Sequence, residues 1–276
     1  MNNLIYLIID SARYDHFCRA KTPVMDRLGR VEKRYSFAGW TSPSHFVYLM
    51  GLTPHLSPVG VFASEIYKLD YQKWASRIGV KKTTMAEFVP EFSLPRFLKK
   101  LGYATHAKVS MPIINPRTIL SQYFDSYRLM DRYDNFPGMI DEIGFTGGAP
   151  SFYFLNLGEA HYPYRISKEE LPPLEGEQGV FKRIDDRFMG APSCADEQMA
   201  ERYFNVGHLN RFREKQIESI EYIDGQIERL LNKCPAGTHL IVTSDHGELF
   251  GEAGYFGHGP IMHEKVFEVP YLEASL

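Results

Sequence analysis

The chain has 276 residues, of which 44% are hydrophobic, and this is enough to build one large domain over residues 1–276. Its 31 basic and 34 acidic residues give a net charge of −3, which argues against a nucleic-acid partner. The apolar run near the N-terminus, residues 4–9, is too short for a membrane span and has no basic start or cleavage site of a signal peptide. We therefore expect a cytoplasmic protein with no membrane span.

The first predicted elements are a strand and two helices. Residues 4–9 form a continuous apolar run rich in Ile, typical of a parallel strand covered on both faces, and the run ends at Asp10. A helix is predicted over residues 22–34, with Pro23 in its first turn. The stretch TSPSHFVYLMGL, residues 41–52, indicates a turn that leads into a second helix.

The middle of the chain is less regular. Residues 53–90 carry three prolines and no clear period, and residues 111–148 are expected to form loops and short helices. Between them, residues 92–109 predict a helix that Gly102 ends, followed by a strand. Residues 151–164 hold another apolar run that ends in acidic and imidazole side chains.

The last part of the chain completes an alternating pattern. Residues 165–195 are rich in Pro, Gly and charge and indicate a surface excursion, in the position of a lid. Residues 211–232 have apolar side chains at helical spacing, and residues 239–244 predict a third clear strand. Strands that alternate with helices predict an α/β fold, with a mostly parallel central sheet flanked by helices on both faces.

Polar side chains follow the predicted strands. In an open α/β sheet, ligands bind at the carboxyl ends of the strands, so these side chains are expected to share one edge. The residues concerned are Asp10 after the first strand, Glu159 and His161 after the second, Asp245 and His246 after the third, and Thr41 after a short apolar segment. Singly, each has a structural interpretation as well, such as a helix cap or a turn residue.

The residue types favour a metal site. Two carboxylates and one imidazole, from Asp10, Asp245 and His246, suit zinc or manganese better than calcium or magnesium, which prefer oxygen ligands alone. A hydroxyl placed against such an ion loses its proton more easily, so Thr41 is the candidate nucleophile toward phosphorus or sulfur.

Seven motifs in order resemble the sulfatase branch of the alkaline phosphatase superfamily over most of the chain. SDHGELFGEAGYFGHG, residues 244–259, is the most specific of them. The others are LIIDSARYD, TPVMDRL, TSPSHFVYLMGLTPH, LPRFLKKLGYAT, AHYPY and IESIEYIDGQIERLL, followed by a weaker VPYL. The resemblance implies the superfamily's fold without most of its C-terminal subdomain, and thus an open cleft or one that a second subunit of a homo-oligomer completes.

Four departures from the sulfatase pattern are informative. Thr41 stands where sulfatases carry the Cys or Ser that is oxidised to formylglycine, and Thr cannot give that aldehyde. Ser11 replaces a second acid after Asp10, His246 replaces an Asn, and His45 replaces the motif Arg. These changes resemble the Thr-nucleophile phosphodiesterases, phosphonate monoester hydrolases and phosphoethanolamine transferases.

The resemblance also implies roles for individual residues. It implies Asp10, Thr41, Asp245 and His246 as metal ligands, with Thr41 as the catalytic nucleophile. It implies that His161 and His258 bind the phosphate group or a second metal ion, and we add His45 to this group because of its place in the motif.

The hypothesis that follows is a hydrolase of phosphoric esters, dependent on one or two zinc or manganese ions. It would act on a small-molecule phosphodiester, phosphomonoester or phosphonate ester through a phosphothreonine at Thr41. The first alternative is a phosphoryl head-group transferase of the phosphoethanolamine transferase type. Two further alternatives rank lower: an arylsulfatase-like hydrolase of sulfuric esters, and a degenerate binding protein without catalysis.

Overall fold

A computed structural model describes residues 1–51, 88–145, 147–164, 204–259 and 261–276, together with residues 69, 73, 75–77, 79 and 171. Most of the irregular stretch 53–90 and almost all of the expected surface excursion 165–195 therefore lie outside the described residues. Within the described parts, none of the helices combines the length and the apolar character that crossing a bilayer requires.

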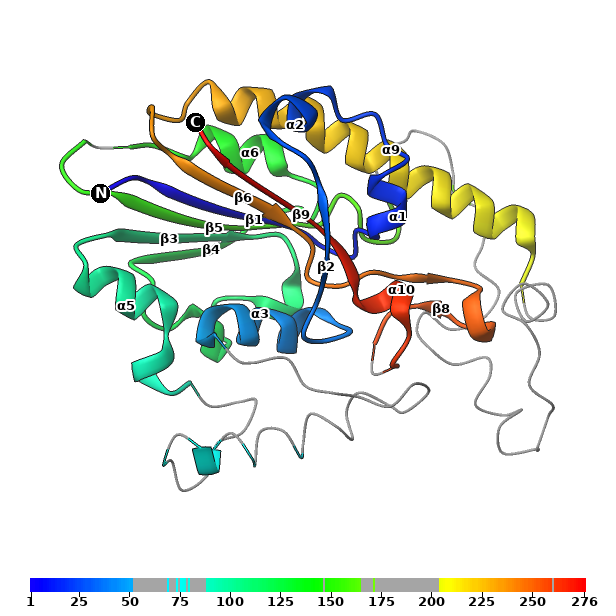
Figure 1. Cartoon of the computed structure of the whole chain (residues 1–276), viewed down its shortest axis with the longest axis horizontal. Coiled ribbons are helices and arrows are strands. Elements are labelled where there is room, and N and C mark those ends of the chain that lie inside the picture. Colours follow the sequence, from blue (N-terminus) through cyan, green and yellow to red (C-terminus); the bar gives the residue numbers. More distant parts are fainter. Residues whose placement is uncertain are drawn as a thin grey trace.

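A seven-stranded sheet forms the centre of the molecule, in the order β2-β9-β6-β1-β5-β3-β4 (Figure 1). β9 runs antiparallel to both of its neighbours, and all other neighbouring strands are parallel. The predicted mostly parallel sheet is thus confirmed. The strands are β1 (Leu4–Ile9), β2 (Glu32–Tyr35), β3 (Ala104–Val109), β4 (Ser126–Leu129), β5 (Ser151–Leu157), β6 (His239–Thr243) and β9 (Glu268–Ser275).

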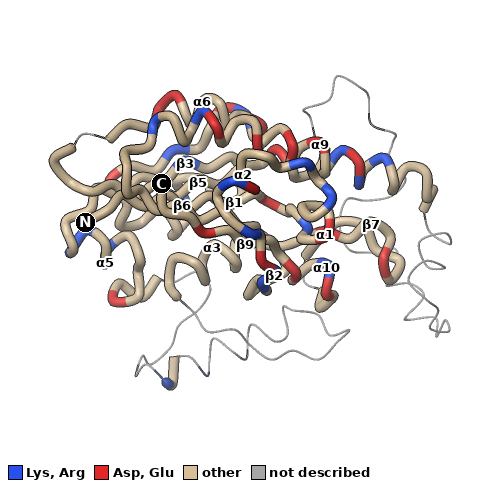
Figure 2. Tube along the Cα trace, turned by 45° about the horizontal axis from the view of Figure 1, so that its top comes forward, with Lys and Arg blue, Asp and Glu red and all other residues tan. Residues whose placement is uncertain are grey.

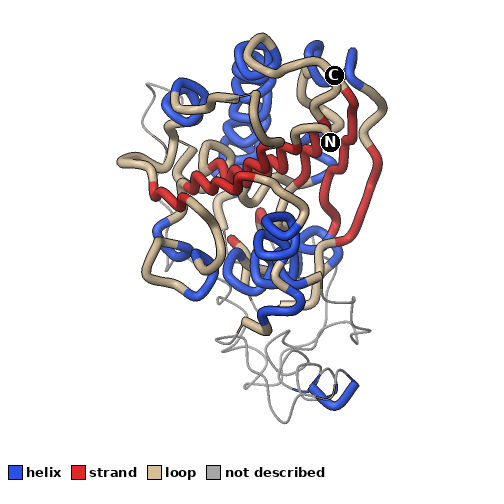
Figure 3. The backbone as a smooth tube through the Cα atoms, turned by 90° about the vertical axis from the view of Figure 1, so that its left-hand side faces the viewer, coloured by secondary structure: helices blue, strands red, loops and turns tan. Residues whose placement is uncertain are grey.

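Helices cover both faces of this sheet, as Figures 1 and 3 show. One face carries α1 (Tyr14–Phe17), α2 (Pro23–Leu28), α6 (Phe136–Asp141) and α9 (Val206–Leu231). The other carries α3 (Thr41–Met50) and α5 (Leu94–Lys100). Shorter elements are η1 (Pro90–Phe92), η2 (Pro112–Ile114), η3 (Ile119–Ser121), η4 (Glu252–Gly254), α10 (Glu264–Phe267) and the two-stranded pair β7 (Leu249–Phe250) and β8 (Phe256–Gly257).

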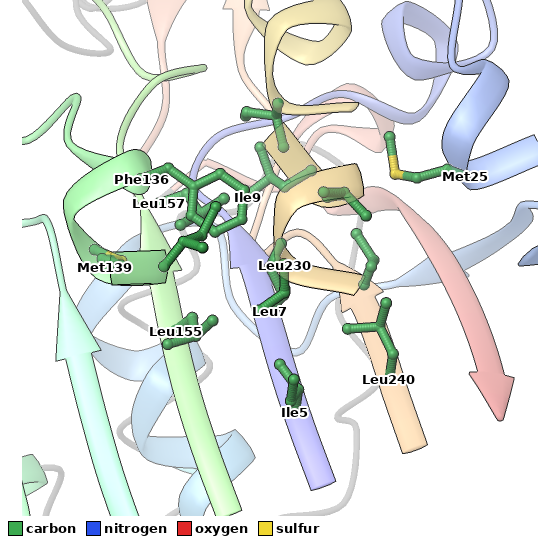
Figure 4. Close-up of a cluster of buried hydrophobic side chains, with 14 of the residues drawn as sticks. Ile5, Leu7, Ile9, Met25, Phe136, Met139, Leu155, Leu157, Leu230 and Leu240 are labelled. Carbon is green, nitrogen blue, oxygen red and sulfur yellow. The ribbon is translucent and has the colours of Figure 1, made fainter. Parts of the chain in front are cut away.

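The core has two halves because the central strands are buried on both faces. On β1, Ile5, Leu7 and Ile9 face the side covered by α9, where Leu230 and Leu240 meet them (Figure 4), and Ile8 faces the side covered by α3. Every residue of β5 is buried. Continuous apolar runs are therefore the correct signature of these strands, as predicted.

The structure differs from the sequence predictions at the edges of the sheet. The helix expected over residues 22–34 ends at Leu28, because Gly29 adopts an extended backbone with φ 164° and residues 32–35 pair with β9 as an edge strand. The strands β4 and β9 were not predicted. β4 is four residues long and only partly buried, and β9 contains Pro270, which weakens the sequence signal of a strand.

Charged side chains of both signs are mixed along α9 (Figure 2). Arg211 pairs with Glu214 at 3.2 Å, and Lys215 pairs with Glu218 at 2.5 Å. This long helix therefore presents no continuous basic face, in line with the low net charge of the chain.

Candidate functional site

The three ligand residues predicted from the sequence meet at the carboxyl edge of the sheet. Asp10 directly follows β1, and Asp245 and His246 follow the neighbouring strand β6. One ligand atom from each of the three residues lies within 4.8 Å of the others, and all three side chains are fully buried. Two strands far apart in the sequence thus deliver their polar ends to one point, as the parallel topology requires.

Thr41 lies at the same point because it is the first residue of α3. Its Oγ1 is 3.3 Å from Nε2 of His246 and 3.5 Å from Oδ2 of Asp10. The hydroxyl therefore faces both an acid and an imidazole of the cluster. Thr41 as a whole is 4% exposed.

The cluster fits a small divalent cation. Nδ1 of His246 lies 3.0 Å from the carbonyl oxygen of Gly247, an arrangement that places the ring proton on Nδ1 and leaves Nε2 free to bind a metal. That Nε2 is 3.3 Å from Oδ2 of Asp245 and 3.8 Å from Oδ1 of Asp10. Oδ2 of Asp245 is buried and has no hydrogen-bond partner in the described residues. A buried carboxylate oxygen is costly unless a cation or a donor satisfies it, so the donor set suits zinc or manganese.

The electrostatics of the two acids differ. Burial alone would raise the pKa of Asp10, but the charges of nearby histidines, of which His161 contributes most, outweigh it and hold that pKa at about 2. Burial and the negative charge of Asp10 both raise the pKa of Asp245 well above its ordinary value. Burial, and the neighbouring His258, lower the pKa of His246 and favour the neutral, metal-binding form.

Hydrogen bonds from the surrounding elements fix the acids. Nδ2 of Asn156, in β5, donates to Oδ2 of Asp10 at 3.0 Å. The backbone N–H of Ser11 donates to Oδ1 of Asp245 at 3.1 Å, and the Ser11 hydroxyl donates to Asp10 at the same distance. The hydroxyls of Ser36 and Ser44 both donate to the carbonyl oxygen of Asp245. Sequence reasoning missed Asn156, although it is a polar residue within an apolar strand.

A second residue that sequence reasoning missed is Gln216, on α9. Its Nε2 donates to the carbonyl oxygens of Ser11, at 3.0 Å, and Ala160, at 3.2 Å. Its Oε1 accepts from the backbone N–H of Arg13 at 3.4 Å and lies 2.7 Å from Nδ1 of His16. This buried amide joins the loop after β1 to the loop that carries His161. The signal was a polar residue within the apolar face of α9.

His161 and His258 lie on the open side of the cluster, and both are partly exposed. The ring centroid of His258 is 4.2 Å from that of His246 and 5.1 Å from that of His161. Nδ1 of His258 is 3.4 Å from Oε1 of Glu248. The structure thus brings both predicted histidines next to the cluster, in a row that leads outward from it.

Residues 251–259 form a loop that contains four glycines, at positions 251, 254, 257 and 259. This glycine-rich loop lies against the site because its backbone closely approaches that of Gly39. The N–H of Gly259 donates to the carbonyl oxygen of Gly39 at 3.0 Å. A Cβ on Gly39 would lie 2.6 Å from the carbonyl oxygen of Gly259, so only glycine fits there without displacement. This contact fixes the loop that carries His258 against the turn that precedes Thr41.

His45 lies beneath the cluster. Its Nδ1 is 2.9 Å from the carbonyl oxygen of Thr41 and 3.7 Å from Oδ2 of Asp245, and the residue is 1% exposed. Its ring packs against Tyr48 and Phe154. A contact between His45 and substrate, which the motif implies, is therefore not visible in this arrangement.

Glu159, the remaining polar residue at a strand end, faces a different element. Its Oε1 accepts a hydrogen bond of 2.6 Å from the backbone N–H of Phe136, at the start of α6. Burial raises its pKa to about 7. Glu159 thus contributes to the packing of α6 and not to the group of ligand atoms around Asp10.

Fold and cluster together define an α/β protein with a candidate metal site at the carboxyl edge of a parallel sheet. The sequence matches the family model described as Sulfatase over residues 2–275, so the chain belongs to the sulfatase family of the alkaline phosphatase superfamily. Members of this superfamily are hydrolases or transferases that act on sulfate or phosphate esters, and they bind divalent metals. A search of curated proteins finds no significant match.

Solved structures with the same fold include transferases and sulfatases. The C-terminal periplasmic domain of EcEptC from Escherichia coli, in complex with Zn, has a TM-score of 0.61 at 14% identity, over 99% of this chain and 72% of that one. The C-terminal periplasmic domain of phosphoethanolamine transferase EptC from Campylobacter jejuni has a TM-score of 0.56 at 15% identity, over 99% and 79%. A putative sulfatase from Bacteroides thetaiotaomicron has a TM-score of 0.61 at 13% identity, over 100% and 64%.

These comparisons contradict the expectation of a cytoplasmic location. Two of the similar structures are periplasmic domains. The expectation rested on a short apolar run that lacks the features of a signal peptide, and such a run carries no information about where a related domain resides.

Proposed function

We propose that the protein is a metal-dependent hydrolase of phosphoric esters that acts through a covalent phosphothreonine at Thr41. The observation that supports this most is the position of the Thr41 hydroxyl, 3.3 Å from Nε2 of His246 and 3.5 Å from Oδ2 of Asp10. A hydroxyl enclosed with an acid and an imidazole is the arrangement that an activated nucleophile needs.

The ligands in this proposal are Asp10, Asp245, His246 and the Thr41 hydroxyl. Bound among them, a zinc or manganese ion supplies positive charge that lowers the pKa of the hydroxyl and neutralises the ester oxygens. His161 and His258 would complete a second ion site or bind the ester oxygens directly. Both rings are partly exposed; that of His258 contacts His246, and that of His161 contacts His258.

The chemistry then takes two steps. The Thr41 hydroxyl gives its proton to a water molecule, and its Oγ1 forms a bond to phosphorus while the bond from phosphorus to the ester oxygen breaks. The leaving alcohol takes up a proton, and His161 and His258 are the nearest partly exposed imidazoles that can supply it. Water next attacks the phosphothreonine, which restores the Thr41 hydroxyl and releases the phosphate product.

The identity of the nucleophile favours phosphorus over sulfur as the reacting atom. Sulfatases resembling this chain use formylglycine, an aldehyde made by oxidation of Cys or Ser. The Cβ atom of Thr41 carries a methyl group, so oxidation there cannot yield an aldehyde. The unmodified hydroxyl is instead suited to form a phosphothreonine.

Trapping the covalent intermediate tests the proposal. Zinc- or manganese-loaded protein is mixed with 4-nitrophenyl phosphate, bis(4-nitrophenyl) phosphate or a phenylphosphonate monoester, quenched in acid, and analysed by peptide mass spectrometry. We expect Thr41 to carry the group that each substrate transfers, which is phosphate, 4-nitrophenyl phosphate or phenylphosphonate respectively, and a loss of hydrolysis of at least about a thousandfold in Thr41→Val. Ser42→Ala, which alters the adjacent hydroxyl, is the matched control. Hydrolysis that survives unchanged in Thr41→Val rules the nucleophile out.

A head-group transferase is the second candidate, because phosphoethanolamine transferases share this fold. In that reaction an acceptor alcohol, instead of water, attacks the phosphothreonine. Phosphorus NMR of the products, with and without glycerol or ethanol as acceptors, separates the two. Matched rates on 4-nitrophenyl sulfate and 4-nitrophenyl phosphate test for sulfatase activity. The metal content of the purified protein tests for a degenerate site, which would come out empty.

A further inference from the structure

A cavity of about 630 Å³ adjoins the candidate site. It is formed by residues that follow β3, β4 and β5, three neighbouring strands of the sheet, and so it opens at the same edge as the metal ligands. His161 is one of the residues that line it. Because the His161 ring lies 5.1 Å from that of His258, and His258 lies 4.2 Å from His246, a row of three imidazoles joins the cavity to the cluster.

Asn156 connects a second part of the cavity wall, at Ser110 and Met111, to the cluster. Nδ2 of Asn156 donates to Asp10 at 3.0 Å, and Oδ1 of the same side chain accepts from the backbone N–H of Met111 at 3.2 Å. The backbone N–H of Ser110 donates to the carbonyl oxygen of Asn156 at 3.0 Å. Ser110 and Met111 both line the cavity. The cavity wall is therefore fixed relative to the metal ligand by direct hydrogen bonds.

The lining is mainly apolar, and its charges are compensated. Met111, Leu129 and Tyr162 supply apolar surface. Arg132 forms two hydrogen bonds with Asp134, of 2.9 and 2.7 Å, so these two opposite charges are paired with each other. The third ionised side chain of the lining, Asp131, is 88% exposed and points to solvent near Arg128. An uncharged, apolar group is the ligand that such a wall accommodates best.

One buried hydroxyl in the wall has no partner in the described residues. Ser110 is 1% exposed, it lines the cavity, and its Oγ makes no hydrogen bond there. Buried hydroxyls are almost always satisfied, so an unsatisfied one at a cavity wall indicates a missing hydrogen-bonding group.

We propose that this cavity binds the organic group of the phosphoric ester, and that it selects an uncharged, largely apolar group, above all an aromatic ring. The inference rests on the proposed function, because it takes the phosphoryl group to lie at the adjacent cluster. It assigns specificity to the loops after β3, β4 and β5, with Met111 as the residue that contacts the ring.

Three phosphonates that cannot be hydrolysed test this by equilibrium binding. Isothermal titration of the zinc- or manganese-loaded protein gives a Kd for methylphosphonate, phenylphosphonate and 2-aminoethylphosphonate. We expect phenylphosphonate to bind about tenfold or more tightly than methylphosphonate, because the ring buries apolar area in the cavity. We expect no such gain for 2-aminoethylphosphonate, whose ammonium group finds no unpaired acid there.

A variant that fills the cavity makes the test specific. Met111→Trp should abolish the advantage of phenylphosphonate and leave the Kd of methylphosphonate within about twofold. Ile113→Trp is the matched control, since it adds the same bulk on the same turn at a side chain that is 58% exposed and outside the cavity lining. It should retain the full advantage of the ring.

The possible outcomes separate the two proposals. Methylphosphonate that fails to bind the loaded protein overturns the proposed function, and the cavity proposal with it. If methylphosphonate binds as well as phenylphosphonate, the cavity proposal alone is overturned. The same holds if phenylphosphonate keeps its tighter binding in Met111→Trp. It also holds if 2-aminoethylphosphonate binds the unaltered protein more tightly than methylphosphonate does. If Met111→Trp does not fold, a crystal structure of the unaltered protein with phenylphosphonate decides: a ring placed outside the cavity refutes the proposal.

Discussion

Asn156 shows how one amide side chain can serve two parts of the candidate site. It donates to Oδ2 of Asp10 and accepts from the backbone of Met111, and it is fully buried in the middle of the sheet. A carboxylate that accepts such a bond keeps one orientation, so its other oxygen can face a cation. Groups that orient metal ligands in this way often matter nearly as much as the ligands themselves.

We therefore expect Asn156→Leu, which preserves the size of the side chain, to weaken the binding of zinc or manganese about 10- to 100-fold. Competition with a chromogenic chelator measures that affinity. Asn210→Leu, at an exposed position of α9, is the control and should leave the affinity unchanged. If Asn156→Leu binds the metal with the same Kd as the unaltered protein, Asp10 does not need the hydrogen bond from Asn156 to hold its orientation.

At the scale of elements, α9 has a role beyond covering one face of the sheet. Gln216 extends from it to Ser11 and Ala160, which belong to the loops that follow β1 and β5. The helix thus sets the spacing between the loop of Asp10 and the loop of His161. Most of its other buried side chains only pack against the apolar core.

Gln216→Leu should lower both metal affinity and stability. The backbone groups of Ser11 and Arg13 lose their hydrogen-bond partner in a buried place, which costs on the order of 1–3 kcal/mol of the free energy of unfolding. Metal titration and urea unfolding measure the two effects. Gln226→Leu is the control, because Gln226 lies on the same helix and its side chain accepts a hydrogen bond from the neighbouring Arg229. A loss of stability with unchanged metal affinity would reduce Gln216 to a packing role.

At the scale of the whole molecule, a buried ion pair joins the N-terminal and C-terminal thirds of the chain. Arg13 contacts Glu252 at 2.7 Å, and the two side chains are 4% and 15% exposed. Burial raises the pKa of Glu252, but the charge and the hydrogen bond of Arg13 outweigh it and hold that pKa at about 2, against an ordinary value of 4.5. Because the folded-state pKa is the lower one, the stabilisation is complete above pH 4.5 and is lost as the pH falls toward 2.

The urea midpoint should therefore fall as the pH is lowered from 5 to 2.5. Glu252→Gln should flatten this dependence, because the neutral amide has no proton to gain in that range. Glu264→Gln, at a side chain that is 68% exposed, is the control and should keep the slope. An identical slope in Glu252→Gln and the unaltered protein would mean that other carboxylates govern acid unfolding.

The sequence could predict those parts of the fold that local patterns determine. The strands β1 and β6 are uninterrupted apolar runs, and α9 has a regular apolar period, so their type follows from residues within one window. The edge strands β2 and β4, and β9 between β2 and β6, have no such pattern. Their structure depends on a partner strand far along the chain: residues 32–35 become a strand because residues 268–271 lie beside them.

The same limit applies to the candidate site. Asp10, Thr41, Asp245 and His246 could be proposed because they follow strands or fall within a recognisable motif. Asn156 could not, because its importance lies in a contact with a residue 146 positions away. The contact of Gln216 with Ser11 spans 205 positions, so its place on the apolar face of α9 could mark the residue as unusual but could not identify its partner.

The neighbouring positions of β1 and β6 in the sheet have a consequence for how the protein is made. A chain that emerges from the ribosome presents Asp10 and Thr41 first, whereas Asp245 follows 204 positions after Thr41 (245 − 41). Until β6 inserts beside β1, a passing ion meets a lone carboxylate and a hydroxyl, too few groups to retain it. In the proposed function, the metal ion would therefore bind only after β6 has joined the sheet beside β1.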